Sequence, residues 1–347
     1  MTSENPVDPT DIASMLFRAF MRRHDLLVVL QAKDTNCYRL FHGTAEGMPG
    51  VTIDRYGRQV LIQTFHHGLA IEELQVIRAS VNDFIESQQD GLFAYRDRST
   101  KASTVVNNIT DEVGDIGPLS CRENGVRFLV KHRETQGNDP YLFLDLRNAR
   151  DHVQQRARGK SVLNLFAYTC GVGICAAVGG ASEVWNVDFA ESSLAIGKQS
   201  AQLNEVDLDA VRFVQGDYFQ VVRQLAGLKP GGKRPHQSSP QARYAPKRFD
   251  LTFLDPPRWA KSRDGTVDLV RDYQSVFKPA LLATKQGGEI ICCNNAAEVE
   301  LDKWLIDLRR CVEKQGRHCC GIEVIAPGED FPSWDGRHPL KIAAVQV

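Results

Sequence analysis

The chain has 347 residues, 42% of them hydrophobic, and a formal net charge of −1 at pH 7. About two domains are expected at roughly 150 residues each, and the balanced charge excludes a protein-wide basic field for nucleic acid. Nine cysteines without metal-ligand or CxxC spacing favour reduced thiols and a cytoplasmic protein. The first residues lack a signal-peptide core, and no apolar segment is long enough to span a membrane.

The N-terminal part of the chain predicts a helix followed by a small α+β domain. Apolar residues recur at helical spacing from Asp11 to Phe20, so residues 1–35 are expected to form a helical segment. Residues 36–115 are expected to form a central domain that could bind RNA. Its elements would be strands at Tyr38–Leu40, Val51–Asp54 and Gln59–Phe65 and a helix at Ile71–Gln88.

A hairpin and a helix are expected next in the chain. Asn124-Gly125 is a strong hairpin signal, so two strands are expected to pair between Cys121 and Lys131. An arginine-rich helix is expected from Leu142 to Ala157.

The stretch from Ser161 to Asp188 has the pattern of a nucleotide-binding βαβ unit. An apolar strand leads to a tight turn at Gly171 and Gly173, and a helix and a second strand follow. Glycines in such a turn let the backbone approach a ligand closely, and the acid at the second strand's end can bind a ribose. The third glycine of the dinucleotide fingerprint is missing, so a plain strand–helix turn is the alternative.

Polar residues also follow three later strand patterns. Asp217 follows Val211–Val214, Asp255 follows Asp250–Leu254, and a pair of asparagines ends Glu289–Cys293. The carboxyl ends of strands converge on one crevice in an open α/β sheet. The sequence therefore predicts an α/β fold with a doubly wound sheet and a ligand site at this edge.

Several motifs together resemble a known family. NLFAYTCGVG, VDFA, LDPPRWAKS and the ENG hairpin followed by FLDLR are similar to the large-subunit ribosomal RNA methyltransferases, which modify 23S RNA at cytosine C5 or guanine N7. FHGTAEGMPGVTIDRYG resembles that family's central domain. The resemblance implies a class I methyltransferase (Rossmann-like) domain at residues 116–347, S-adenosylmethionine as donor and ribosomal RNA as partner. No metal and no membrane are expected, and a homodimer is left open.

The resemblance also assigns the donor site. The residues that would bind S-adenosylmethionine are Arg147, Asn164, Phe166, Tyr168, Gly171, Asp188, Phe189 and Asp217. In this assignment Asp188 binds the ribose, Phe189 and Asp217 contact the adenine, and Arg147 reaches the carboxylate. The chain departs from the family where Cys170 and Leu146 replace a glycine and a glutamine, and where residues 138–140 replace Lys-Thr-Gly.

The acceptor site is expected around the turn that begins at Asp255. Two prolines fix its backbone, so its carbonyl groups could face a planar base. The expected catalytic residues are Asp255, Pro256, Pro257 and Asn295, and the expected substrate-binding residues are Arg258, Trp259, Lys261 and Asn294. Each assignment has a structural alternative. Asp255 to Pro257 could form only a rigid turn, and Trp259 could be a core residue. Arg258 and Lys261 could lie in a solvated loop, and the two asparagines could form a turn at the strand end.

The residue at position 295 bears on which atom is methylated. Cytosine C5 enzymes add a cysteine thiolate to the ring, and family members of that kind carry the cysteine where Asn295 stands here. Guanine members carry paired asparagines, as Asn294 and Asn295 do. Cys293 lies about 6.6 Å back along the strand, which is too far to replace it. Guanine N7 is therefore the favoured acceptor, with cytosine C5 as the alternative.

Two further questions remain open from the sequence. The basic insertion from Lys229 to Arg248 is either a surface loop, which is favoured, or an RNA-binding finger. The protein is expected to be an RNA methyltransferase. The alternatives are a methyltransferase of another substrate and a non-catalytic RNA-binding relative.

Overall fold

The computed structural model describes residues 9–85, 92–99, 105–108, 119–130, 140–229 and 243–347. The chain forms two compact units, one of Met1–Leu144 with Gly328–Arg337 and one of Asp145–Pro327 with His338–Val347. The sequence expectation placed a boundary at residue 116. The structure instead groups the hairpin with the first unit, together with a ten-residue segment from near the end of the chain.

The first unit is built on a five-stranded sheet in the order β1-β2-β3-β4-β5. Neighbouring strands are antiparallel except β3 and β4, which are parallel and joined by a helix. Its elements are α1 (Pro9–Ala32), β1 (Cys37–His42), α2 (Gly43–Glu46), β2 (Val51–Tyr56), β3 (Gln59–Thr64), α3 (Ile71–Ile85), β4 (Leu92–Asp97), β5 (Val105–Asn108), β6 (Leu119–Glu123) and β7 (Val126–Val130). The predicted hairpin is present, with Asn124 and Gly125 in left-handed backbone between β6 and β7.

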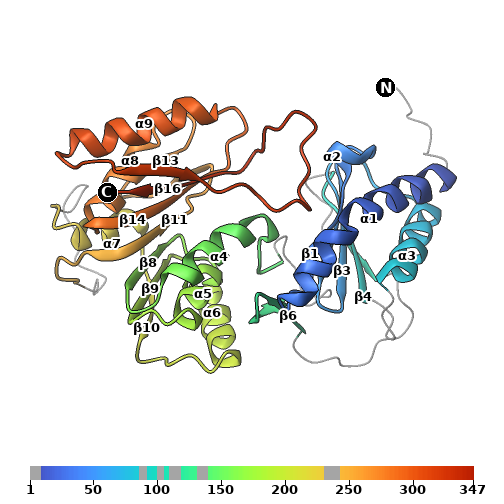
Figure 1. Cartoon of the computed structure of the whole chain (residues 1–347), viewed down its shortest axis with the longest axis horizontal. Helices are drawn as coiled ribbons and strands as arrows, with labels where there is room; N and C mark the ends of the chain where they lie inside the picture. Colours follow the sequence, from blue (N-terminus) through green and yellow to red (C-terminus); the bar gives the residue numbers. More distant parts are fainter. Residues whose placement is uncertain (1–8, 86–91, 100–104, 109–118, 131–139, 230–242) are drawn as a thin grey trace. The chain divides into compact units, whose positions relative to one another are not determined.

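Helices α1 and α3 pack on one face of this sheet (Figure 1). The apolar spacing of both helices turns their buried side chains toward the strands, and the rings of Phe20 and Phe84 stack with their centroids 4.4 Å apart. α1 lies within residues 1–35, where a helical segment was expected, and it continues twelve residues beyond the apolar pattern that ends at Phe20. Arg23 and Leu30 in this extension are also buried.

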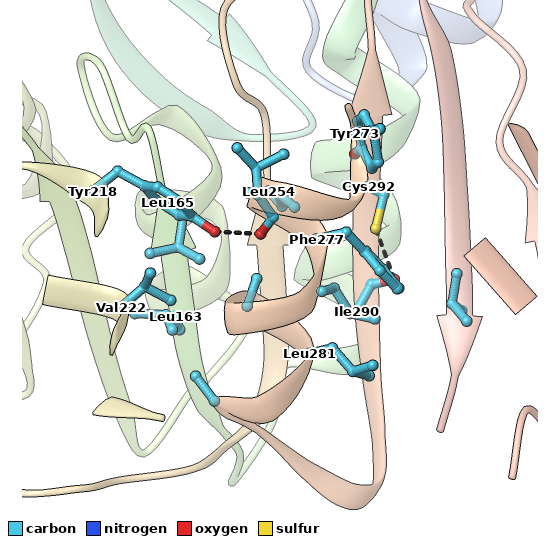
Figure 2. Packing of buried hydrophobic residues seen from close by; sticks show 14 of the residues in the cluster. Leu163, Leu165, Tyr218, Val222, Leu254, Tyr273, Phe277, Leu281, Ile290 and Cys292 are labelled. Carbon is cyan, nitrogen blue, oxygen red and sulfur yellow. Dashed lines mark hydrogen bonds between the residues drawn. The ribbon is translucent and has the colours of Figure 1, made fainter. Parts of the chain in front are cut away.

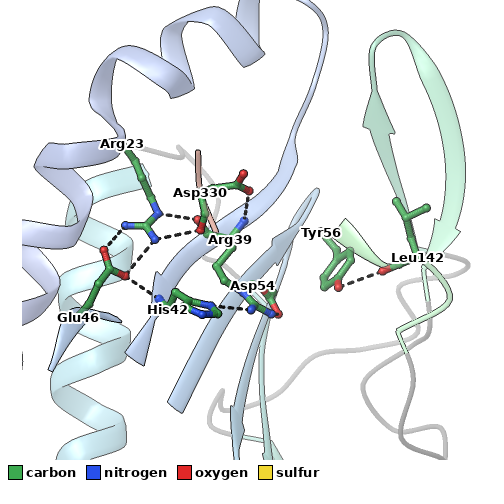
Figure 3. Close-up of polar contacts among 8 residues, drawn as sticks. All are labelled: Arg23, Arg39, His42, Glu46, Asp54, Tyr56, Leu142 and Asp330. Atoms are coloured by element: carbon green, nitrogen blue, oxygen red, sulfur yellow. Dashed lines mark hydrogen bonds and ion pairs between the residues drawn. The ribbon is translucent and has the colours of Figure 1, made fainter. Parts of the chain in front are cut away.

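A buried ionic network ties the segment at 328–337 into the first unit (Figure 3). Arg23 pairs with Glu46 at 2.6 Å and donates to the carbonyl of Asp330 at 3.1 Å. The Asp330 carboxylate accepts the backbone N–H of Arg39, whose guanidinium pairs with Asp54 at 2.8 Å. Asp330 is fully buried, so this segment is an integral part of the unit's interior.

The second unit contains a seven-stranded sheet in the order β10-β9-β8-β11-β14-β16-β15. β16 is antiparallel to its neighbours, and the first five strands are parallel. The elements are a 3₁₀ turn η1 (Leu144–Leu146), α4 (Arg147–Arg156), β8 (Ser161–Leu165), α5 (Gly171–Val178), β9 (Glu183–Asp188), α6 (Glu191–Leu203), β10 (Val211–Gln215), α7 (Tyr218–Leu225), β11 (Phe249–Leu254), β12 (Trp259–Lys261), β13 (Thr266–Asp268), α8 (Gln274–Leu282), β14 (Thr284–Asn294), α9 (Leu301–Lys314), β15 (Gly321–Val324) and β16 (Lys341–Gln346).

Helices cover both faces of this sheet, as a doubly wound fold requires. α7, α8 and α9 cover one face of the sheet. There the strand residues Leu163, Leu254 and Ile290 pack against helix residues such as Phe277 (Figure 2). The other face packs against α4 and α5 through Val162, Phe253, Ile291 and their neighbours. Near-continuous apolar strands are typical of parallel sheets buried on both sides. The predicted α/β doubly wound sheet is confirmed.

Candidate active site

Five parallel strands end at one edge of the second unit's sheet. β8, β9, β10, β11 and β14 run in the same direction, so the residues that follow them gather along this edge. Adjacent β8 and β11 lead to helices on opposite faces of the sheet, which makes their ends the switch point where ligands bind in such folds. The structure thus brings together the strand-end residues singled out from the sequence.

The turn between β8 and α5 has an unusual backbone. Phe166, Tyr168 and Cys170 have φ values of 57°, 48° and 63°, a left-handed region that costs non-glycine residues about 1–3 kcal/mol each. The two glycines expected to make this turn instead lie in the first turn of α5. The strained residues are therefore the ones that shape the edge of the site, and the ring of Phe166 is fixed by stacking on Tyr218 at 4.5 Å.

Gly173 serves the packing of α5 against the sheet. A Cβ at this position would lie 1.9 Å from Oδ1 of Asn186 on β9. Asn186 is fully buried and its Oδ1 accepts from the amide of Asn164 at 2.9 Å. Asn164, expected to line the donor, thus sits inside the sheet with its amide bonded to Asn186.

Asp188 and Phe189 end β9 at the edge of the site. The two carboxylate oxygens of Asp188 accept the backbone N–H groups of Tyr168 at 2.8 Å and Ala190 at 2.9 Å. These bonds fix the carboxylate beside the β8 turn, and its remaining lone pairs can accept from a ligand's hydroxyl groups. Phe189 is 76% exposed, so it presents a free aromatic face next to the acid.

Asp217 caps α7. Its Oδ1 accepts the backbone N–H groups of Phe219 at 2.9 Å and Gln220 at 3.2 Å, which is the usual bonding of an acidic helix cap. The other carboxylate oxygen has no hydrogen bond among the described residues and can accept from a ligand. Asp217 therefore has a structural role as the cap of α7, and its second oxygen is left for the binding role expected from the sequence.

Asp255 lies at the end of β11 in a cluster of ionisable groups. Burial and the nearby negative charge of Asp145 raise the pKa of its carboxyl group from 3.8 to about 7. A hydrogen bond from the Cys293 thiol and the positive charge of Arg150 act in the opposite direction. The carboxyl group thus changes its charge near neutral pH, which is where a catalytic group is most useful.

The cysteines at the end of β14 are fully buried. Burial raises the pKa of both the Cys292 and Cys293 thiols well above the usual value, and the negative charge of Asp255 raises that of Cys293 further. Next to them, Asn294 is also buried, and its amide donates to the Leu269 carbonyl at 3.4 Å and accepts from Ala296 at 3.0 Å. Asn295, in contrast, is exposed at the strand end.

The residues after Pro257 form a small hairpin of β12 and β13. Trp259 is 63% exposed, and Lys261 is also exposed, which suits contact with a large substrate. Arg258 forms an ion pair with Glu298. The hairpin is held against α7, since the Asp264 carboxylate accepts from the Gln220 amide at 2.5 Å.

Comparison with known proteins identifies the kind of site. The sequence pattern of a family described as S-adenosylmethionine-dependent methyltransferases matches residues 38–343. The chain belongs to this family. Its donor is therefore S-adenosylmethionine, and the predicted enzyme class is confirmed.

Individual relatives agree with this assignment. The methyltransferase is 28% identical over 331 residues to a putative ribosomal RNA large subunit methyltransferase, YwbD, of Bacillus subtilis, covering 94% of this chain and 76% of the relative. It is 28% identical over 301 residues to ribosomal RNA large subunit methyltransferase I of Serratia proteamaculans, covering 85% and 70%.

Solved structures show the same fold. A putative methyltransferase named SMU.776, complexed with SAH, is similar over 99% of this methyltransferase and 83% of that chain, with a TM-score of 0.78 and 23% identity. A SAM-dependent methyltransferase from Agrobacterium tumefaciens has a TM-score of 0.60, 14% identity and coverage of 86% and 88%. The predicted class I methyltransferase fold is confirmed.

The strand-end residues fit the donor. An adenosine needs acceptors for its ribose hydroxyls and amino group and an apolar face for its ring, and Asp188, Asp217 and the exposed Phe189 offer these at neighbouring strand ends. Arg147 is buried in the first turn of α4. Gly171 begins α5 directly after the strained turn.

The sequence did not predict the surroundings of Asp255. Asp145, Arg150 and Cys293 all act on its carboxyl group, but nothing in the sequence places them beside it. The sequence contained one signal for Arg150. It stands at helical spacing from the apolar residues Leu146 and Val153, which indicates the buried face of α4, and the structure buries it there.

Other expectations can be compared with the described residues alone. Within them no three metal-ligating side chains cluster, and no helix is long and apolar enough to cross a membrane. Among the described residues, no disulfide joins any of the nine cysteines. The basic insertion at 229–248 falls mostly outside the described residues.

Proposed function

We propose that this methyltransferase modifies a base of large-subunit ribosomal RNA and that the acceptor atom is guanine N7. The relatives' names support the RNA substrate. The observation that carries the choice of atom is the state of the β14 thiols, which are fully buried, so burial raises their pKa and disfavours the nucleophilic thiolate.

Guanine N7 already has an exposed lone pair, so it needs no covalent help from the protein. S-adenosylmethionine, when bound, supplies the electrophilic methyl group. Asp188 would hold the ribose, Phe189 would stack on the adenine and Asp217 would accept from its amino group. Arg147, Phe166, Tyr168 and Gly171 would shape the methionine end, with Asn164 supporting the strand beneath them.

Asp255 would act on the acceptor base. Methylation at N7 places a positive charge on the guanine ring, and a fixed carboxylate near that ring stabilises charge as it develops. Pro256 and Pro257 would hold the turn in shape, and the exposed amide of Asn295 would hydrogen-bond a base edge. Asn294 would support that turn from its buried position.

Exposed residues beyond the turn would contact the rest of the RNA. Arg258 and Lys261 would meet phosphates, and the exposed ring of Trp259 would stack on an unpaired base. A cytoplasmic location belongs to the same proposal, because free thiols persist in a reducing compartment.

Cytosine C5 is the second candidate, and one contact favours it. The thiol of Cys293 donates to Asp255, and a carboxylate beside a cysteine could remove its proton. The raised thiol pKa opposes this transfer, because the proton is held more tightly by sulfur than by the carboxyl group.

The test is to map modified nucleosides in ribosomal RNA from cells with and without the protein and from Cys292→Ala and Cys293→Ala variants. We expect an N7-methylguanosine that depends on the protein and survives in both variants. A 5-methylcytidine that disappears in Cys293→Ala, with an RNA adduct trapped by 5-fluorocytosine, would assign cytosine chemistry. No change in RNA methylation would refute the RNA substrate itself.

A further inference from the structure

The end of β14 extends beyond the strands on either side of it. β11 pairs with β14 no further than Cys292, and β16 pairs with it no further than Asn294. Asn295 follows as an exposed residue between Asn294 and Ala296, which are both fully buried. In the part of the chain that the structure describes, no strand pairs with β14 beyond Asn294, so other contacts are needed to fix the position of Asn295.

Tyr273 supplies the first of these contacts. Its hydroxyl donates to the carbonyl of Cys293 at 2.9 Å, and the ring lies next to Cys292 (Figure 2). The ring is 8% exposed and meets the ring of Trp304 edge to face, with the centroids 5.3 Å apart. A hydroxyl on a packed ring has little freedom to move. It is therefore a rigid donor to the carbonyl that stands two residues before Asn295.

Lys341 supplies the second contact, on the other side of Asn295. Its ammonium group donates to the carbonyl of Ala296 at 2.8 Å and to the carbonyl of Pro339 at 3.0 Å. Lys341 is 9% exposed and forms no ion pair among the described residues, and burial lowers the pKa of its ammonium group. A buried charge without a partner of opposite sign destabilises a fold. Stability alone therefore does not account for this lysine.

The bond from Lys341 is not needed to satisfy the carbonyl of Ala296. The same oxygen also accepts the backbone N–H of Val299 at 3.1 Å, so it would keep a partner without the lysine. What Lys341 adds is a link between the loop after β14 and the start of β16. Tyr273 comes from a different part of the unit, the segment between β13 and α8. The chain around Asn295 is thus held by two separate elements.

We propose that Tyr273 and Lys341 are positioning residues that fix Asn295 for its contact with the acceptor base. They act through two carbonyl groups, those of Cys293 and Ala296, on either side of Asn295. An amide side chain directs its oxygen or its amino group at a base edge only if its backbone is held in place, and a misplacement of about 1 Å can cost roughly 100-fold in rate. This assignment rests on the proposed function, in which Asn295 hydrogen-bonds a base edge.

The direct test measures the loop itself, so it does not depend on RNA methylation. Backbone hydrogen exchange is followed by mass spectrometry in the full chain saturated with S-adenosylmethionine, for the wild type, Tyr273→Phe and Lys341→Met. The N–H groups of Ala296 and Val299 are hydrogen-bonded and report on the loop. In each variant they should exchange about two- to tenfold faster, the range for one lost hydrogen bond. Unchanged exchange around Asn295 would overturn the proposal.

Two control variants carry the same substitutions elsewhere in the unit. Lys285→Met removes a lysine at the start of β14, and Tyr244→Phe removes the hydroxyl of a ring that packs on Trp185. Neither should change the exchange of the loop or the kinetics on RNA. Thermal midpoints verify that all variants fold. The midpoint of Lys341→Met should stay near that of the wild type, because the substitution removes a buried charge together with its bonds.

Kinetics on ribosomal RNA test what the positioning serves. Asn295→Ala should raise the KM for RNA about tenfold, the loss of one hydrogen bond to a base edge, with an unchanged Kd for S-adenosylmethionine. Tyr273→Phe and Lys341→Met should raise the KM by no more than this, and neither should raise it further when combined with Asn295→Ala. A residue with a merely structural role would act by the same factor in both backgrounds, and that result would overturn the proposal.

The remaining outcomes separate this inference from the proposed function. If the wild type does not methylate ribosomal RNA, the proposed function fails, and hydrogen exchange alone decides whether Tyr273 and Lys341 fix the loop. If Asn295→Ala raises the KM for RNA but neither of the two other variants does, the inference fails and the proposed function stands. If Asn295→Ala has normal kinetics on RNA, Asn295 contacts no base, and the inference fails with that contact.

Discussion

The two halves of the active edge are built by different means. At the ends of β8, β9 and β10, backbone N–H groups fix the carboxylates of Asp188 and Asp217 in position. At the ends of β11 and β14, Asp255 is surrounded by side chains whose charges oppose one another. The half proposed to bind the donor, the donor half, is thus a fixed template. The charge of the half proposed to bind the acceptor, the acceptor half, depends on pH and on the neighbouring charged groups.

The surroundings of Asp255 explain why its carboxyl group titrates near neutrality. A carboxylate that accepts backbone N–H groups is stabilised in its charged form. Asp255 lacks such compensation for its burial, so its pKa rises to about 7. Methyl transfer should therefore change with pH around 7.

The largest expected effect follows from removing the charge of Asp255. Asp255→Asn should lower kcat about 100- to 1,000-fold, as for the loss of one electrostatic contact to a transition state, and leave the Kd for S-adenosylmethionine unchanged. In the wild type, kcat should rise with pH through about 7 because the ionised form is active. A flat pH profile, or a variant with normal turnover on ribosomal RNA, would show that the turn is only structural.

The same variant should be more stable than the wild type at high pH. The folded state binds the Asp255 proton more tightly than the unfolded state, whose pKa is near 3.8. Ionisation therefore costs the wild type stability as pH rises from about 4 to about 7, by at most about 4 kcal/mol for a shift of roughly three units. Denaturant midpoints should be equal at pH 4 and higher for Asp255→Asn at pH 8.

The next effect tests the fixed template. Asp188→Ala removes the acceptor of two backbone N–H groups and the acceptor that we propose for the ribose hydroxyls. Calorimetry should show weaker S-adenosylmethionine binding, by about 1.5–3 kcal/mol for each lost bond to the charged group. Glu191→Ala, at an exposed acid three residues later, is the matched control and should bind normally. Equal affinities of the two variants would remove Asp188 from the donor site.

A third prediction concerns the support beneath the template. Gly173→Ala places a methyl group against Asn186 and should lower the free energy of unfolding by about 1–3 kcal/mol. The new methyl group and the Asn164 amide both contact the side-chain oxygen of Asn186. The double variant with Asn186→Ala should therefore lose less stability than the sum of the losses in the two single variants. Strict additivity in denaturant unfolding would contradict this close approach.

The smallest effect is expected at Phe189. Its ring is 76% exposed, so Phe189→Ala should change stability by no more than about 0.5 kcal/mol. Donor affinity should fall by about 1 kcal/mol or somewhat more, the value of one aromatic–base stack. Calorimetry with S-adenosylmethionine and with methionine alone separates the effects, because only the ligand with an adenine should respond.

The donor half was more predictable from sequence than the acceptor half. Its acids directly follow strands that short apolar runs in the sequence already indicate. The hairpin was predictable for a similar reason, because Asn124-Gly125 is a local turn signal. The role of Gly173 was not predictable, because it depends on Asn186 in a neighbouring strand. The raised pKa of Asp255 depends on its burial and on the negative charge of Asp145, which is over one hundred positions away and comes close only in the fold.

The segment that carries Asp330 has a consequence for how the protein is made. Arg23 and Asp330 are 307 positions apart, so a ribosome must synthesise nearly all of the intervening chain before the first unit can close its ionic network. β16 lies between β14 and β15 and also emerges after them. Neither unit can finish folding while the chain is still short. Nascent chains released before Asp330 should therefore be protease-sensitive in both units.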